Sequence, residues 1–82
     1  MWFVYILECE DGNLYTGITN DLEKRFIDHK DGNGGKYTRS HKPVKFVYQE
    51  QLPSRAHALK REFEIKSWSR ERKIKTFHLS NK

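Results

Sequence analysis

The sequence predicts an α+β fold in which helices pack on a three-stranded, mainly antiparallel sheet. The first observation is a pair of apolar runs, residues 3–9 and 14–19, that are rich in aromatic and β-branched residues. The polar segment between them contains Asp11-Gly12, a strong hairpin signal. The second observation is that apolar residues recur at helical spacing after residues that can cap a helix. Together these patterns predict the element order β-β-α-β-α-α.

After the hairpin, the sequence predicts a helix over residues 21–30. Asn20 can cap its first turn, and Glu23, three residues later, completes a capping-box pattern. The expected apolar stripe of this helix consists of Leu22, Phe26 and Ile27. A glycine-rich polar stretch that begins at Asp31 ends the helix.

The second half of the chain begins with a strand expected over residues 44–52. Ser54 can cap the helix that we expect over residues 55–66. A last helix is expected over residues 70–77, and its core-facing residues at i, i+3 are Ile74 and Phe77.

The length and composition exclude several classes of protein. A chain of 82 residues fits one domain, here residues 1–82. The single Cys9 excludes an internal disulfide and a cysteine-based zinc site. No apolar run approaches the roughly 20 residues that cross a bilayer, and the start lacks the basic flank of a signal peptide. We therefore expect a cytoplasmic protein without a membrane partner.

The net charge of +5 is concentrated in the second half of the chain. Residues 1–41 carry five Lys/Arg against seven Asp/Glu, whereas residues 42–82 carry eleven against four. Such a surface is either an ordinary solvated face or a binding surface that attracts a polyanion. The charge therefore favours nucleic acid as a partner but says nothing about catalysis.

Glu62 is an unusual residue for its place in the sequence. It shares a face of the predicted helix with apolar residues three or four positions away, namely Ala58, Leu59 and Ile65. A carboxylate on a core-facing stripe requires a cation, a metal ion or hydrogen bonds. An ion pair with Arg25, or with Lys66 at i+4, satisfies this requirement as well as a functional role does.

Arg25 and His29 share one face of the predicted first helix at i, i+4. An arginine suits a phosphate because its planar fork donates two hydrogen bonds at once. A histidine can relay a proton or bind phosphate because its ordinary pKa lies near 6.5. The alternative is that both are ordinary polar residues at the edge of a helix, without a functional role.

Tyr5 and Tyr15 occupy equivalent places on the two hairpin strands, so both hydroxyl groups can lie on one face of the sheet. They are either core tyrosines with bonded hydroxyls or part of a catalytic site. A tyrosine acts as a base only if a metal ion or cations lower its pKa from about 10.

The glycine-rich segment after the first helix carries a further group of polar residues: Lys36, Tyr37, Thr38 and Arg39. Cations and hydroxyls of this kind bind phosphates, and glycines permit close approach of the backbone. The segment is therefore a candidate nucleic-acid-binding loop, although a solvated connector has the same composition.

In these residues and their spacing, the chain resembles the GIY-YIG nuclease superfamily, in particular its small, single-domain bacterial branch. Phe3-Val4-Tyr5 stands where the family has Gly-Ile-Tyr, and Tyr15-Thr16-Gly17 stands where it has Tyr-Ile-Gly. Arg25, His29 and Glu62 match the positions of the family's catalytic arginine, a following His or Tyr, and its metal-binding glutamate. The first glycine is here Phe3, and the Asn that repair nucleases of the family carry after the glutamate has no counterpart near residues 72–75.

The resemblance, which spans roughly residues 2–75, implies metal-dependent hydrolysis of phosphodiester bonds, with structure-selective DNA cleavage in repair or recombination. Glu62 is expected to hold one Mg²⁺ or Mn²⁺, and Arg25 to neutralise charge on the phosphoryl oxygens. Tyr5 is expected to activate the attacking water with help from Tyr15 or His29, and Gly17 to allow the substrate backbone to approach. The alternative is an inactive nucleic-acid-binding module or an accessory subunit that positions a protein partner.

Overall fold

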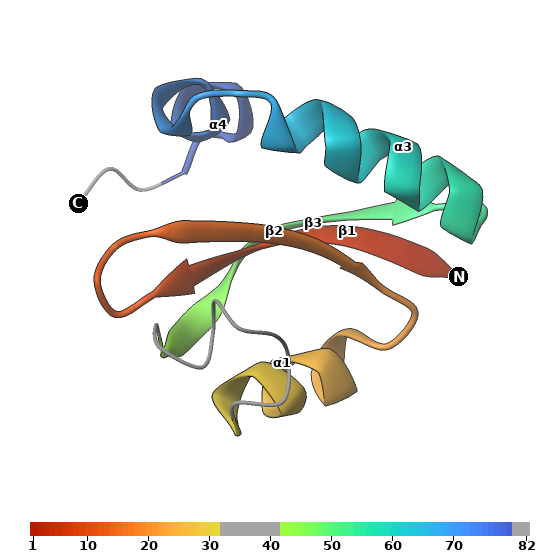
Figure 1. The fold of residues 1–82 in the computed structure, drawn as a ribbon, viewed down its shortest axis with the longest axis horizontal. Helices are drawn as coiled ribbons and strands as arrows, with labels where there is room; N and C mark the ends of the chain where they lie inside the picture. The colour runs from red at the N-terminus through yellow and green to blue at the C-terminus, as the bar shows by residue number, and fades with distance from the viewer. Residues whose placement is uncertain (32–41, 80–82) are drawn as a thin grey trace.

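A computed structural model describes residues 1–31 and 42–79 of the chain. Its strands are β1 (Trp2–Cys9), β2 (Leu14–Thr19) and β3 (Pro43–Leu52), and its helices are α1 (Leu22–Lys30), α3 (Arg55–Lys66) and α4 (Arg70–Phe77) (Figure 1). The predicted α+β class and the order β-β-α-β-α-α are confirmed. In these two segments, no helix combines the length and the apolar character that a membrane span requires.

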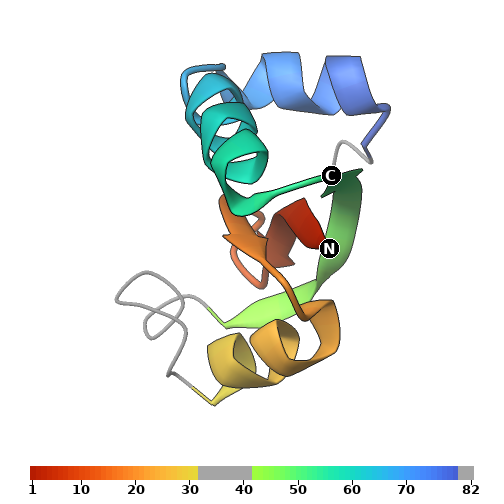
Figure 2. The ribbon, with the colours of Figure 1, turned by 90° about the vertical axis from the view of Figure 1, so that its right-hand side faces the viewer.

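The sheet has the order β2-β1-β3, and β1 pairs antiparallel with both neighbours. Successive side chains of a strand point to opposite faces, so Tyr5 and Leu7 lie on one face while Val4 and Ile6 lie on the other. Figure 2 shows the sheet as a middle layer, with α1 on one side and α3 and α4 on the other. Helices therefore pack on both faces of the sheet, and the central strand β1 contributes side chains to both interfaces.

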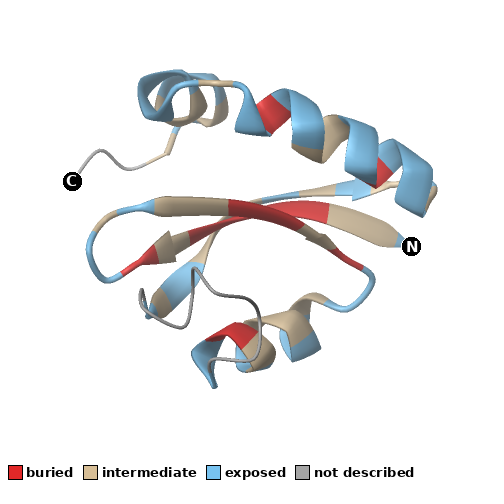
Figure 3. Ribbon diagram, in the orientation of Figure 1, coloured by how far each residue is buried: buried red, intermediate tan, exposed pale blue. Residues whose placement is uncertain are grey.

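The main core lies between the sheet and α3. It is built from four fully buried side chains: Val4, Ile6, Ala58 and Ile65. Half-buried residues surround this core, and among them Phe77 of α4 stacks on Tyr48 with 3.8 Å between ring centroids. Figure 3 shows that buried positions gather on the central strand, whereas most of α3 and α4 is exposed.

The first turn of α1 differs from the expectation because Asp21, not Asn20, caps the helix. The Asp21 carboxylate accepts a hydrogen bond from the backbone N–H of Lys24 at 3.1 Å. The hydroxyl of Thr19 accepts from the backbone N–H of Asp21 at 3.0 Å and holds the chain extended for one more residue. The helix therefore begins at Leu22, one residue later than predicted.

Ile27 was expected on the buried stripe of α1, but its side chain is 51% exposed. Consecutive residues of a helix are separated by about 100° around its axis. The side that faces the sheet carries Arg25, Phe26 and His29, and Ile27 lies beyond the edge of this side. The prediction for Ile27 is therefore wrong because α1 buries only a narrow strip.

Replacing Thr16 with valine is expected to raise the free energy of unfolding by about 1 kcal/mol. Thr16 is 3% exposed, and its Oγ1 atom has no hydrogen-bond partner within the described part of the chain. Removing an unsatisfied hydroxyl from the interior removes its desolvation cost. Urea unfolding of both proteins measures the change.

Thr19 offers a matched control, because it is also buried and its Oγ1 atom takes part in two hydrogen bonds with Asp21. Thr19→Val should therefore lower the free energy of unfolding by roughly 1 kcal/mol or more. A loss of stability in Thr16→Val as large as that in Thr19→Val would mean that the Thr16 hydroxyl has a partner.

Candidate active site

The hydroxyl of Tyr5 is the centre of a polar cluster between β1 and α1. It lies 2.7 Å from Nε2 of His29 and accepts a hydrogen bond from Nε of Arg25 at 3.3 Å. Both Tyr5 and His29 are completely buried, whereas Arg25 is half-buried. The structure therefore brings together three predicted site residues that are as many as 24 positions apart in the sequence.

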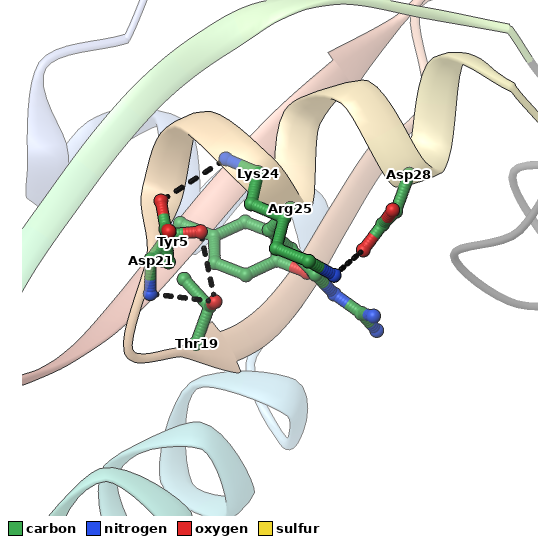
Figure 4. Close-up of polar contacts among 6 residues, drawn as sticks. All are labelled: Tyr5, Thr19, Asp21, Lys24, Arg25 and Asp28. Carbon is green, nitrogen blue, oxygen red and sulfur yellow. Dashed lines mark hydrogen bonds and ion pairs between the residues drawn. The ribbon is translucent and has the colours of Figure 1, made fainter.

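The junction between β2 and α1 directs Arg25 and His29 toward the sheet. Thr19 and Asp21 bond to each other through the Thr19 hydroxyl, and the Asp21 carboxylate caps the helix (Figure 4). The helix that starts from this fixed turn carries Arg25 and His29 four residues apart, on the side that faces Tyr5. On its outer side, Lys24 pairs with Asp28 at 3.3 Å.

Tyr15 completes an aromatic group around this cluster. Its ring centroid lies 6.3 Å from that of Tyr5 and 5.1 Å from that of His29, which it meets edge to face. Tyr15 is half-buried, in contrast to Tyr5. The expectation that both tyrosines share one face of the sheet is thus met by the geometry.

Gly17 lies directly opposite Tyr5 in the β1–β2 register. A Cβ atom at Gly17 would lie 2.5 Å from the Tyr5 hydroxyl and 2.7 Å from its Cζ atom, which is too close for any real contact. The space that the glycine leaves is therefore filled by the Tyr5 side chain. Approach of a substrate backbone at Gly17 stays a prediction.

The ionisation of the cluster follows from its burial. Burial raises the pKa of Tyr5 to about 12, although the hydrogen bond and charge of Arg25 oppose the rise. Burial also lowers the pKa of His29 to about 4, and the neighbouring charge of Arg25 adds to this effect. At neutral pH, Tyr5 is therefore a phenol and His29 a neutral imidazole.

The buried His29 is expected to make the fold sensitive to acid. The folded pKa is about 4 and the unfolded value is near 6.5, so between these values the unfolded chain binds more protons. The free energy of unfolding should therefore fall as the pH drops from 6.5 to 4, by on the order of 3 kcal/mol in total. Urea unfolding between pH 7 and pH 4 measures this slope.

His29→Gln removes the titrating group and should flatten the slope between pH 6.5 and pH 4. His57→Gln, which removes an exposed histidine, is the matched control and should keep the wild-type slope. Parallel slopes for the wild type and His29→Gln would show that acid stability depends on other groups.

Glu62 lies on α3, across the sheet from α1. Its side chain is 19% exposed and pairs with Lys66 at 3.3 Å, so the predicted i, i+4 ion pair is present. Lys66 lies 6.0 Å from the ring centroid of Tyr15, which places this pair near the β2 edge of the sheet. The negative charge of Glu62 also contributes to the raised pKa of Tyr5. Glu62 therefore borders the tyrosines and does not lie in the closed core.

The stripe on which Glu62 was expected is only partly buried. Ala58 and Ile65 are fully buried, but Leu59 is 39% exposed. The helix rests on the sheet along Ala58 and Ile65, and Leu59 lies about 100° around the axis from Ala58. The prediction that Leu59 faces the core is therefore wrong.

Glu62 is also the predicted metal ligand. No three His, Cys, Asp or Glu side chains that are suited to a metal ion gather in residues 1–31 and 42–79. One half-buried carboxylate nevertheless fits Mg²⁺ or Mn²⁺, because such ions bind one or two carboxylates and keep waters and substrate phosphates as their other ligands. A single carboxylate would leave most of the coordination of such an ion to water and to substrate phosphates.

The predicted loop residues Lys36, Tyr37, Thr38 and Arg39 lie outside the described residues. The structure adds one residue to the site, Phe46 of β3, whose ring centroid lies 5.2 Å from that of Tyr5. A break in the β1–β3 register between Ile6 and Leu7 places Phe46 opposite Leu7, on the face that carries Tyr5. No signal in the sequence marks this bulge, so Phe46 was not predicted.

Comparison with known proteins identifies a family for this chain. The family model of the GIY-YIG catalytic domain matches residues 1–75. UPF0213 protein SSP2268 of Staphylococcus saprophyticus is 52% identical over 73 residues, which are 89% of each chain. UPF0213 protein SERP0126 of Staphylococcus epidermidis is 51% identical, again over 89% of each chain.

Solved structures show the same relationship. The solution NMR structure of UPF0213 protein BH0048 from Bacillus halodurans is 43% identical, with a TM-score of 0.58 over 93% of this chain and 82% of that one. The solution NMR structure of protein EF2693 from E. faecalis is 35% identical, with a TM-score of 0.60 over 98% of this chain and 88% of that one. Because the family model matches residues 1–75 and a relative is 52% identical over 89% of this chain, the chain belongs to the GIY-YIG family of catalytic domains.

Proposed function

We propose that this protein is a metal-dependent endonuclease that hydrolyses phosphodiester bonds in DNA. The observation that carries the proposal is the Tyr5 hydroxyl, which holds both His29 and Arg25 beside Tyr15. A packing role alone needs neither a buried histidine nor an arginine at this place. The membership in a family of catalytic domains and the basic second half of the chain agree with it.

The proposed site has a supporting layer and a contact layer. The supporting layer is Tyr5 and His29, which are fully buried and fix each other through a 2.7 Å hydrogen bond. The contact layer is Arg25, Tyr15 and Glu62, which are half-buried and can meet a substrate. The arrangement is that of a preorganised site, in which buried groups hold the orientation of the groups that touch the substrate.

Arg25 is proposed to stabilise the charge that develops on the phosphoryl oxygens. Its guanidinium carries five N–H donors, of which Nε–H is directed to Tyr5. This hydrogen bond ties the guanidinium to the strand that carries Tyr5. A planar, permanently charged fork in a fixed orientation is suited to a phosphate whose charge increases in the transition state.

Hydrolysis requires that water attacks phosphorus and gives up a proton, that one ester P–O bond breaks, and that the leaving oxygen takes up a proton. A divalent cation bound at Glu62 would supply positive charge at the scissile phosphate and the leaving oxygen. Tyr15, the more exposed of the two tyrosines, is proposed to contact the attacking water. Tyr5 is proposed to orient Arg25 and His29 through its two hydrogen bonds.

The proposed substrate is DNA that is recognised by its shape, in repair or recombination. The contact layer comes from short elements, and α1, which carries Arg25, has only 9 residues. Reading a long sequence in the major groove requires a helix or ribbon that reaches the base edges. A surface this small can still recognise the shape of a DNA substrate, such as a flap, a branch or a single strand.

The test is a cleavage assay on labelled duplex, single-stranded, flapped and four-way DNA and on RNA, with Mg²⁺, Mn²⁺ or a chelator. Metal-dependent cleavage is expected, and Glu62→Gln should lower its rate by on the order of 10²-fold or more. Glu64→Gln is the matched control, because it removes the same charge two residues later from an exposed side chain. Equal cleavage rates for the two variants would show that Glu62 has no role in the active site.

The second candidate function is a nucleic-acid-binding module without activity. The concentration of positive charge in residues 42–82 favours it as strongly as it favours a nuclease. Salt-sensitive binding to DNA without cleavage under every metal condition would establish this function, and Glu62 would then be the structural partner of Lys66.

A further inference from the structure

A lysine on α4 is half-buried without a negative partner. Lys73 belongs to no ion pair among residues 1–31 and 42–79. Burial lowers the pKa of its ammonium group, and the positive charge of Lys66 lowers this pKa further. The methylene stem of a lysine often covers apolar surface, which explains the burial but not a place beside a second cation. The protein therefore holds a positive charge here at a cost in free energy.

Lys73 is connected to the candidate site through Lys66. The charge of Lys66 acts on Lys73, so the two ammonium groups are neighbours. Lys66 in turn pairs with Glu62 at 3.3 Å and lies 6.0 Å from the ring centroid of Tyr15. Because the pair of Lys66 and Glu62 is neutral as a whole, Lys73 supplies the uncompensated positive charge on this side of the contact layer.

The other cations in the first half of α4 already have partners. Arg70, one turn before Lys73, donates a hydrogen bond from Nη2 to the backbone carbonyl of Gly12 at 3.0 Å, which ties α4 to the turn before β2. Arg72 lies over the ring of Trp68, 4.4 Å from its centroid. Within the described part of the chain, Lys73 is thus the one cation of residues 70–73 whose charged group has no partner. Its helix lies on the same side of the sheet as α3 (Figure 2).

We propose that the ammonium group of Lys73 binds a phosphate of the DNA strand that passes Glu62 and Tyr15. The proposal rests on the proposed nuclease function for the identity of this strand as the substrate. A lysine binds phosphate as a point charge, and a negative charge beside Lys73 offsets both its desolvation and its repulsion by Lys66. Because a phosphate contact carries no sequence information, Lys73 fixes the register of the strand without reading its bases.

The surrounding charge favours a polyanion over an isolated anion as the occupant. Residues 42–82, which include α3 and α4, carry eleven Lys/Arg against four Asp/Glu. A strand whose phosphate is held in the contact layer carries further charges along the same backbone, and these meet the cations beyond Glu62. An isolated anion at Lys73 has no such connection to the candidate site.

The experiment measures the binding of fluorescently labelled duplex and single-stranded DNA by anisotropy at several salt concentrations, in chelator so that no metal-dependent cleavage occurs. Lys73→Met removes the charge and keeps an apolar stem of similar length. It is expected to weaken binding by about 10-fold at about 50 mM salt. The slope of log affinity against log salt should become shallower by about 0.9 for the duplex and about 0.7 for the single strand, the values for one lost phosphate contact. Lys73→Arg should keep the wild-type slope.

Lys75→Met is the matched control, because it removes the same charge from an exposed side chain two residues later on α4. Its salt slope should equal that of the wild type. An unchanged slope in Lys73→Met, or the absence of salt-sensitive binding in the wild type, would overturn the proposal. Equal reductions in Lys73→Met and Lys75→Met would also overturn it, because a general loss of charge would then explain both.

Single-turnover cleavage with metal separates this proposal from that of the nuclease. Lys73→Met should raise the protein concentration that gives half the maximal rate and leave the maximal rate within about 2-fold of the wild type. A lower maximal rate with unchanged affinity would overturn the binding role. If the wild type cleaves nothing and Lys73→Met still has the shallower salt slope, the nuclease is refuted and the phosphate contact is kept.

Discussion

Replacing Arg25 with alanine is expected to lower the single-turnover rate of DNA cleavage by on the order of 10²-fold or more. Arg25 is half-buried and donates through Nε to the Tyr5 hydroxyl at 3.3 Å. Its guanidinium is thus held in one orientation before the substrate arrives, which is the condition for strong stabilisation of transition-state charge. Single-turnover kinetics at saturating enzyme separate this effect from weaker binding.

Lys24→Ala is the matched control for this experiment. Lys24 precedes Arg25 on α1, carries the same charge, and pairs with Asp28. Its loss should reduce affinity at low salt and leave the single-turnover rate unchanged. If Arg25→Ala also loses affinity alone, Arg25 is a binding residue and does not act in the chemical step.

Arg25→Lys refines the interpretation. A lysine keeps the charge but lacks the Nε–H that donates to Tyr5 and the planar fork. A rate close to that of Arg25→Ala would show that orientation matters more than charge. Recovery to the wild-type rate would show that charge alone is sufficient.

The elements of the fold were predictable because their signals are local. The Asp11-Gly12 turn between two apolar runs predicted the hairpin, and the Ser54 cap predicted the start of α3. The cap of α1 was misplaced because Asn20 and Asp21 are both good caps. The hydroxyl of Thr19 decides between them, and that hydrogen bond forms only in the folded turn.

The site was only partly predictable, because its properties depend on packing between distant segments. The family resemblance indicated Tyr5, Arg25 and His29, and the structure brings them together. Neither the complete burial of Tyr5 and His29 nor the resulting opposite shifts of their pKa values follows from local pattern. Likewise, Phe46 contacts Tyr5 because the β1–β3 register shifts, and no residue type in the sequence indicates this shift.

Replacing Gly17 with alanine is expected to lower the free energy of unfolding by about 1–3 kcal/mol and the cleavage rate by on the order of 10²-fold. The new Cβ atom would lie 2.5 Å from the Tyr5 hydroxyl and 3.2 Å from Cε2 of Tyr15. Tyr5 cannot turn away without losing its bonds to His29 and Arg25. Urea unfolding and single-turnover cleavage measure the two effects.

Gly12→Ala separates loss of stability from damage to the site. Gly12 has a φ of +85°, which strains any other residue, but among the described residues nothing lies closer to its Cβ position than Arg70 at 4.0 Å. This variant should therefore lose about 1 kcal/mol of stability and keep its cleavage rate. If Gly17→Ala also kept the wild-type cleavage rate, the site would tolerate movement of Tyr5.

A double-mutant cycle locates the cause of the Gly17→Ala effect. In a Tyr5→Leu background, the phenol that the new methyl group would meet is absent, so Gly17→Ala should cost much less stability than in the wild type. A coupling energy of about 1 kcal/mol or more would show that the glycine is present for the tyrosine. Independent effects would mean that the small residue at position 17 serves something else, and approach of the substrate backbone would then be the better explanation. If the two substitutions are coupled, Gly17 and Tyr5 act as a pair. A residue without a side chain on β2 then makes the room in which Tyr5 of β1 can hold Arg25.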